Sequence, residues 1–269
     1  MAVRRIYLLD YGWLAGDGGW FLPGWGAATY SEREPKRVWI EFPVSGALLD
    51  TDAGYILFDT GVALDAWKTH TRNVMEAFPF IKYSDDNRIE NQLKRLNLRV
   101  EDIAAVIHSH LHFDHVGQTV VFRDTKTPLI VHKKELQTAL MLLWLGKEGG
   151  YQSANLEPLK GANWYIVDLP VFELTDGVKL YFSGGHTSGH MILTVRTSKG
   201  NNYLFTADHI HIPKELELES KGWLLGDYDE WLTFVKHIKL WERIDRHKII
   251  ICHDLDLWSK YPRIPGYLE

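Results

Sequence analysis

Short runs of branched and aromatic residues recur along this chain, and polar residues, Gly or Pro separate them. Such runs are typical of strands, because these side chains pack well on a pleated, half-buried surface. We therefore predict strands at 5–9, 38–42, 55–59, 103–109, 128–132, 164–168, 178–183, 191–197, 202–208 and 248–254.

A second pattern, with apolar residues three or four positions apart, predicts helices at 84–98, 133–146 and 227–244. In the first of these, Ile89, Leu93 and Leu96 share one face, and Asp85 or Asp86 is placed to cap it. Strands in two groups with interspersed helices indicate an α/β fold in which two sheets pack together and helices cover them. We expect one domain over residues 1–269.

The segment 12–30 follows neither pattern. It is rich in Gly, contains three Trp, and includes Pro23. Gly-rich sequence forms regular elements at a high entropic cost, so we expect a loop. Two interpretations stay open: a surface loop pinned by its aromatic side chains, or a loop over a substrate pocket.

Composition narrows the class of protein. The formal net charge is −5, which argues against a nucleic-acid partner, because such proteins usually present a basic face. No apolar run approaches the roughly 18 residues of a membrane span, so we expect no membrane partner. The single Cys252 excludes an intrachain disulfide and fits a cytoplasmic location. By strand alternation we expect its thiol to point into the core, away from the side of its neighbour His253.

Histidine is the residue that composition leaves unexplained, with 13 in the chain. Four of them lie in HSHLHFDH (108–115), directly after an apolar strand. His110 and His112 are two residues apart, so in extended chain they point the same way and can bind one ion. Asp114 and His115 follow and can turn toward a second position. This density favours a metal site.

Three further clusters stand at the ends of predicted strands: SGGHTSGH (183–190), FTADH (205–209) and ICHD (251–254). Each adds one ligand of a type that divalent transition metals accept. Asp208 has two carboxylate oxygens and can bridge two ions. The resulting sets are His110, His112 and His186 for one metal, and Asp114, His115 and His253 for the other.

These motifs, together with ILFDTG (56–61), resemble the metallo-β-lactamase superfamily, whose pattern of seven ligand positions is filled here. The resemblance implies an αβ/βα four-layer sandwich and a dinuclear site, usually zinc. Iron, cobalt or manganese also accept His and Asp ligands. In the family, a carboxylate at the position of Asp59 orients a metal-binding loop.

Within the superfamily the chain is most similar to the N-acyl homoserine lactonases. The resemblance implies a hydrolase that opens the lactone ring with a hydroxide shared by two metals. Asp114 or Asp208 would then take and return a proton. Another small lactone, an ester or a phosphodiester is an alternative substrate. A diiron redox protein is less favoured, because the chain has no flavodoxin-like domain.

One position departs from the lactonase pattern. The family usually has Tyr three residues after the bridging Asp, whereas this chain has His211. We expect its imidazole N–H to donate to the substrate carbonyl or its oxyanion, and a solvated loop residue is the alternative.

The apolar segment 137–146 and the aromatic residues of 13–25 suggest a pocket for an acyl chain. Two alternative interpretations of the segment 137–146 stay open: it belongs to the core, or it forms a homodimer contact.

Overall fold

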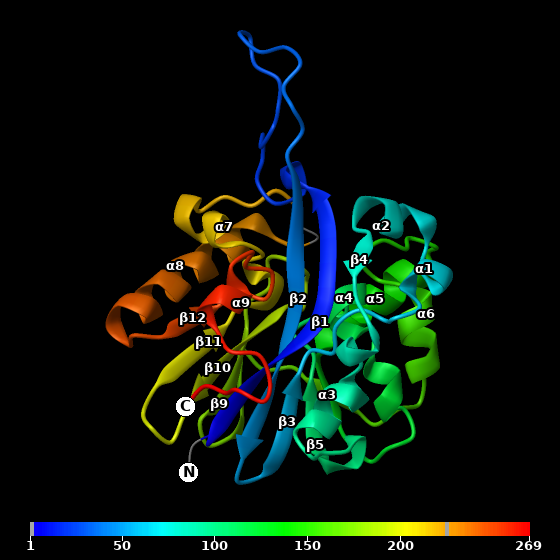
Figure 1. Cartoon of the computed structure of the whole chain (residues 1–269), viewed down its shortest axis with the longest axis vertical. Coiled ribbons are helices and arrows are strands. Elements are labelled where there is room, and N and C mark those ends of the chain that lie inside the picture. The colour runs from blue at the N-terminus through cyan, green and yellow to red at the C-terminus, as the bar shows by residue number, and fades with distance from the viewer. Residues whose placement is uncertain (1–2, 224–225) are drawn as a thin grey trace.

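The structure, a computed structural model, describes residues 3–223 and 226–269. Two β-sheets face each other, and helices cover the outer face of each, which makes four layers (Figure 1). The predicted αβ/βα sandwich is therefore confirmed. Among the described residues, no helix is both long and apolar enough to cross a membrane.

The larger sheet has the strand order β4-β1-β2-β3-β5-β6-β7. Its long strands β1 and β2 are antiparallel, whereas β3, β5, β6 and β7 run parallel to one another. The bounds are β1 Arg5–Asp17, β2 Trp39–Thr51, β3 Gly54–Phe58, β4 Phe80–Lys82, β5 Ile103–Ile107, β6 Leu129–His132 and β7 Trp164–Val167.

The smaller sheet has the order β12-β11-β10-β9-β8, and β12 pairs in parallel with β11. Its strands are β8 Val171–Thr175, β9 Val178–Phe182, β10 Met191–Arg196, β11 Asn202–Phe205 and β12 Lys248–Ile250.

Helices α1–α6 lie over the larger sheet, and α7 and α8 lie over the smaller one (Figure 1). The helices are α1 Ala66–Thr69, α2 Arg72–Ala77, α3 Ile89–Arg95, α4 Phe113–Val116, α5 Lys133–Trp144, α6 Ser153–Leu156, α7 Pro213–Leu218, α8 Tyr228–Ile244 and α9 Leu257–Lys260.

Strand β1 shows how side-chain alternation divides the interior. Ile6 and Leu8 belong to the core between the two sheets, whereas Tyr7 and Leu9 belong to the core beneath the helices. Successive side chains of a strand point to opposite faces, so a strand with both faces covered is apolar throughout. The ends of such buried strands carry the polar residues described below.

Several predicted boundaries are wrong. Residues 12–17 are the second half of β1, and the predicted strand at 38–42 continues to Thr51. The predicted helix 84–98 splits into a 3-10 turn and α3, and the side chain of Ser84, not of Asp85 or Asp86, caps the turn. Strands β4 and β8 and helix α7 were not predicted.

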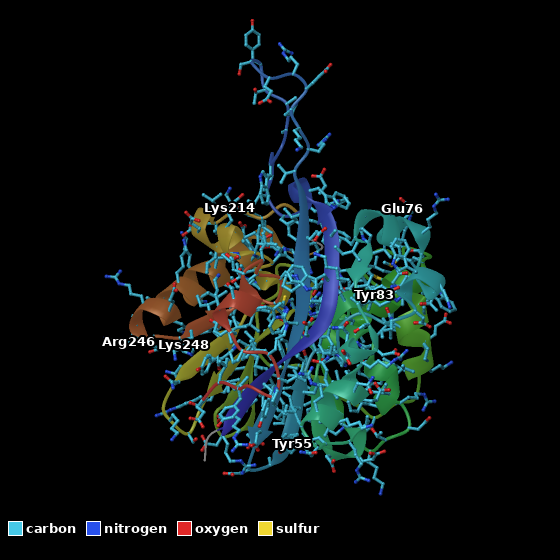
Figure 2. The ribbon with its side chains drawn as sticks, viewed as in Figure 1. Tyr55, Glu76, Tyr83, Lys214, Arg246 and Lys248 are labelled. Atoms are coloured by element: carbon cyan, nitrogen blue, oxygen red, sulfur yellow. The ribbon has the colours of Figure 1, made fainter. Side chains whose placement is uncertain are left out.

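The connection between β1 and β2 projects away from the body of the molecule (Figure 1). Tyr30 within it is 90% exposed. Lys214, labelled in Figure 2, lies at the foot of the projection, and its Nζ is 5.1 Å from the ring centroid of Trp25. Trp25 therefore packs against α7, at the base of the loop.

Candidate dinuclear metal centre

The seven predicted ligands lie together at the ends of strands β5, β9, β11 and β12, and each is buried. Parallel strands that end at one edge of a sheet bring distant sequence segments together there. The ligands are His110, His112, Asp114, His115, His186, Asp208 and His253.

A first group consists of His110, His112, His186 and Asp208, whose ligand atoms lie within 4.8 Å of one another. Nε2 of His186 is 3.0 Å from Nδ1 of His112. Oδ2 of Asp208 is 3.4 Å from Nε2 of His186 and 3.6 Å from Nε2 of His110. Three ring nitrogens and one carboxylate oxygen therefore face one point.

A second group lies on the other side of Asp208. Oδ1 of Asp208 is 3.0 Å from Nε2 of His115 and 3.1 Å from Nε2 of His253. Oδ2 of Asp114 is 3.5 Å from the same nitrogen of His253. Each carboxylate oxygen of Asp208 thus faces a different group, which is the geometry of a bridging ligand.

Cys252 is also part of the second group, and the prediction that its thiol points away from the site is wrong. Its Sγ is 3.3 Å from Oδ1 of Asp208. Strand β12 ends at Ile250, so strand alternation does not continue to residue 252. Burial, and then the charge of Asp208, raise the pKa of this thiol well above its ordinary value. The protonated thiol can therefore donate to the carboxylate.

The chemistry of this donor set fits two divalent cations. Nε2 of His110, His115 and His253 is buried, faces Asp208, and has no other hydrogen-bond partner among the described residues. Burial lowers the pKa of His110 and His186 well below the ordinary value and that of His112 to about 3. The histidines of the first group are therefore held in the neutral form, which is the form that binds metal.

Asp208 is suited to the same role by its charge. Burial alone would raise the pKa of Asp208, but the facing His115 and His253 hold it well below its usual range. A carboxylate that stays ionised while buried needs compensating positive charge, which bound cations also supply.

Asp59 fixes the second group from behind, as the resemblance implied. Its Oδ2 accepts from Nδ1 of His115 at 2.8 Å, and its Oδ1 accepts from the backbone N–H of Ser109 at 2.8 Å. Nδ1 of His253 donates to the carbonyl oxygen of Pro43 at 2.7 Å. Such contacts set the tautomer and the orientation of a ligating ring.

His211 is buried beside Asp208, so the alternative of a solvated loop residue is wrong. Its Nε2 is 3.4 Å from Oδ2 of Asp208, and its Nδ1 is 2.9 Å from Oε1 of Glu215. The backbone N–H of His211 donates to Oε2 of Glu215 at 2.6 Å. Glu215 therefore grips both the ring and the backbone of this residue.

Lys221 completes this buried network. Its Nζ donates to the backbone carbonyls of Asp208 and His209 and lies 3.6 Å from Oε2 of Glu215. Burial and the Lys221 charge lower the pKa of His211, but Glu215 and Asp208 outweigh them, so the net shift is upward. Neither Glu215 nor Lys221 was predicted, although Glu215 lies one helical turn after His211.

A cavity of about 190 Å³ opens over both groups. Asp114, Asp208, His112, His211 and His253 form part of its lining. Most of the remaining wall is apolar: Leu14, Trp20, Phe21, Phe42, Val74, Ala77, Phe78, Phe113 and Trp223.

The cavity tests the two predictions about the acyl pocket. Trp20 and Phe21 line it, so part of the segment 12–30 does lie at the pocket, whereas Trp25 is outside the lining. No residue of 137–146 lines it, so the prediction that this segment forms the pocket is wrong. Within that segment, Ala139 is in the core, and Trp144 is 91% exposed. A homodimer contact there stays a prediction.

A family model described as the metallo-beta-lactamase superfamily matches residues 39–253. The chain therefore belongs to this superfamily, as its fold and its ligand pattern indicate. Among characterised relatives it is 30% identical, over 273 residues and the full length of both chains, to an N-acyl homoserine lactonase of Bacillus thuringiensis. It is also 30% identical to N-acyl homoserine lactonase AiiB of Agrobacterium fabrum, over 95% of each chain.

A solved structure of an N-acyl homoserine lactone hydrolase superimposes with a TM-score of 0.81, covering 100% of both chains at 26% identity. In that structure the product N-hexanoyl-L-homoserine is bound at the catalytic metal centre. The relatives and the superposition thus agree on one class of hydrolase.

Proposed function

We propose that this protein is a metal-dependent hydrolase that opens the ring of N-acyl homoserine lactones. The observation that carries the proposal is the pair of buried ligand groups that share Asp208 at the floor of an apolar cavity. The full-length similarity to N-acyl homoserine lactonases supports the choice of substrate.

Two divalent cations, which we propose are zinc, fit the two groups. His110, His112 and His186 would hold one, Asp114, His115 and His253 would hold the other, and Asp208 would bridge them. When bound, such ions polarise a carbonyl and lower the pKa of water, so that hydrolysis proceeds near neutral pH. His and Asp ligands in groups of this kind suit zinc.

Asp114 and Asp208 are the groups placed to handle the proton of the reaction. Both line the cavity, and both are nearly inaccessible to bulk solvent. A carboxylate within hydrogen-bond reach of the attacking water can take its proton and return it to the leaving ring oxygen. The product is the open-chain N-acyl homoserine.

His211 binds the lactone carbonyl oxygen in place of the tyrosine of the resembled family. Its Nδ1 lies 2.9 Å from Oε1 of Glu215 and 3.1 Å from Nζ of Lys221, so Nε2 is the edge that faces the cavity. With its proton on Nε2, the ring donates to the carbonyl as negative charge develops there. Lys221 can then donate to Nδ1.

The apolar wall receives the acyl chain. The rings of Trp20 and Phe78 are 5.6 Å apart, and those of Trp20 and Trp223 are 6.5 Å apart. Aromatic rings bury large apolar areas without demanding specific polar partners. We therefore expect longer acyl chains to bind more tightly than short ones.

Ring opening of homoserine lactones with graded acyl chains, followed with and without a chelator, tests the proposal. We expect turnover to require metal, at two equivalents per chain by elemental analysis. Faster turnover of a simple ester or a phosphodiester under the same conditions would replace the proposed substrate. Full activity after complete metal removal would refute the proposal itself.

A cytoplasmic location and a homodimeric state remain predictions. Sedimentation velocity of the purified protein tests the second of these.

A further inference from the structure

Two histidines of the first group, His112 and His186, differ from the other three histidine ligands at the ring nitrogen that faces away from the site. In the same group, Nδ1 of His110 lies 3.0 Å from Oγ of Ser109. In the second group, Nδ1 of His115 and of His253 each has a protein partner. Nε2 of His112 and Nδ1 of His186 are buried and have no hydrogen-bond partner within the part of the chain that the structure describes. Ligating histidines are usually oriented through that second nitrogen. His112 and His186 therefore need another means of orientation.

Glu135 supplies contacts directly behind these two histidines. It lies in the first turn of α5, and it is 0% exposed. Oε1 accepts hydrogen bonds from the backbone N–H of Leu111 at 3.0 Å and from the hydroxyl of Tyr151 at 2.9 Å. Oε2 accepts from the hydroxyl of Thr187 at 2.6 Å and from the backbone N–H of Gly189 at 3.2 Å.

Three of these four donors belong to the segments that carry the ligands. Leu111 lies between His110 and His112, and Thr187 directly follows His186. A single carboxylate thus joins the two loops whose histidines face each other at 3.0 Å.

The remaining donor, Tyr151, contacts the ligand itself. The ring of Tyr151 packs edge-on against that of His112, with 4.8 Å between centroids. Glu135 therefore also holds the aromatic side chain that buttresses His112.

Close backbone approach shows that the arrangement is tightly fitted. A Cβ at Gly189 would lie 2.0 Å from the backbone nitrogen of Glu135, so only glycine allows the His186 loop to reach α5. A Cβ at Gly150 would lie 2.5 Å from the ring of His112. Neither the His186 loop nor the His112 ring can therefore shift without moving the backbone packed against it.

A role limited to helix capping does not account for these bonds. A carboxylate in the first turn of a helix interacts favourably with the helix dipole. However, all four hydrogen bonds of Glu135 come from outside α5. Buried polar networks with every member satisfied rigidify the groups that they join.

We propose that Glu135 is a positioning residue that sets the spacing of His112 and His186, and thereby the affinity of the first ligand group for its metal ion. The inference rests on the metal assignment of the proposed function. Glu135 acts through its hydrogen bonds on the first ligand group and not on the second.

The test is a metal titration of the full chain against a competing chelator, with Zn²⁺ as the probe. Anomalous scattering from crystals grown at limiting Zn²⁺ reports the occupancy of each group separately. Glu135→Gln keeps the side-chain size but replaces one acceptor oxygen by an NH₂ donor. We expect the first group to bind Zn²⁺ about 10- to 100-fold more weakly, with the second group changed much less.

Asp59→Asn is the matched control, because Asp59 is the buried carboxylate behind the second group. It should weaken the second group more than the first, which Asp59 reaches only through the Ser109 hydroxyl beside Nδ1 of His110. Thr187→Val and Tyr151→Phe each remove one donor to Glu135 and leave its charge in place. They keep the test decisive if Glu135→Gln does not fold, and each should weaken the first group about 3- to 10-fold.

Wild-type occupancy of the first group in Glu135→Gln, or in both single-donor variants, would overturn the inference. Equal weakening of both groups, together with a lower unfolding midpoint of the metal-free protein, would also overturn it, because Glu135 would then support the fold generally. A wild-type protein that binds no Zn²⁺ would instead refute the proposed function.

Discussion

The cavity has two walls that differ in kind. On one side, His211 lines the cavity and is held from behind by the buried Glu215 and Lys221, through hydrogen bonds and charge. On the other side, Trp20 is 40% exposed, and its ring packs against those of Phe78 and Trp223. The polar wall holds its groups in one geometry, which transition-state stabilisation requires. The apolar wall can adjust to chains of different length.

This difference teaches that turnover and substrate affinity reside in separate parts of the molecule. Contacts made only as charge develops at the carbonyl should affect kcat, whereas uniform contacts with the acyl chain should affect KM. Substitutions in the polar wall should therefore lower kcat, whereas substitutions in the apolar wall should raise KM.

The largest effect is expected where both walls meet the metal centre. Asp208→Ala removes the carboxylate shared by the two groups. Because charge stabilisation by the metals is worth several kcal/mol, kcat/KM should fall by more than about 10³-fold for every acyl length. Elemental analysis should show fewer than two metals per chain. Two tightly bound metals with normal turnover would contradict the bridging role.

Substitution in the polar wall should lower turnover alone. His211→Phe removes the donor that faces the cavity, so kcat should fall about 10²-fold while metal content stays unchanged. His211→Tyr restores a donor of the resembled family and should retain much of the activity. Steady-state kinetics on one short and one long lactone measure both. A wild-type kcat in His211→Phe would mean that this ring does not contact the carbonyl.

Substitution in the apolar wall should raise KM in proportion to chain length. Trp20→Ala removes a ring that lines the cavity, which should raise KM for long chains about tenfold and for short chains much less. Trp25→Ala is the matched control, because Trp25 belongs to the same segment but lies outside the lining. If the two variants behave alike, the effect is one of loop structure and not of acyl binding.

The smallest effect concerns stability beneath the apolar wall. His70 packs against Phe113 of the cavity lining, and burial lowers its pKa from 6.5 to about 4. The unfolded chain therefore takes up this proton first, and the associated stability, complete above pH 6.5, is lost as pH falls toward 4.

Between pH 7 and pH 5.5 the wild type should lose about 1 kcal/mol more unfolding free energy than His70→Leu. Urea denaturation at both pH values measures this difference. Parallel losses in the two proteins would show that His70 is protonated equally in the folded and unfolded states.

The gathering of the candidate ligands could be predicted from the sequence because it depends on local facts. His110, His112 and His115 are neighbours in the chain, and His186 and Asp208 lie at or just after the ends of predicted strands. The layers could be predicted for the same reason, since each strand reports its own burial by its residue types.

What escaped prediction depends on contacts between distant segments. Glu135 and Lys221 acquire their roles only when loops far apart in the sequence meet. The thiol of Cys252 faces Asp208 because β12 stops earlier than its apolar run suggests. Likewise, Gly12 stands in β1 where a Cβ would lie 2.8 Å from the ring of Phe80, so this glycine marks close packing and not a loop.

Strand β1 has a consequence for how the protein unfolds. Leu8 and Leu9 are adjacent in sequence, yet each is packed in a different core, and Leu14 of the same strand lines the cavity. Loss of either core therefore removes the backbone support of the other. We expect a single cooperative transition in which both sheets and the cavity melt together, and the amide protons of β1 should exchange only through global opening.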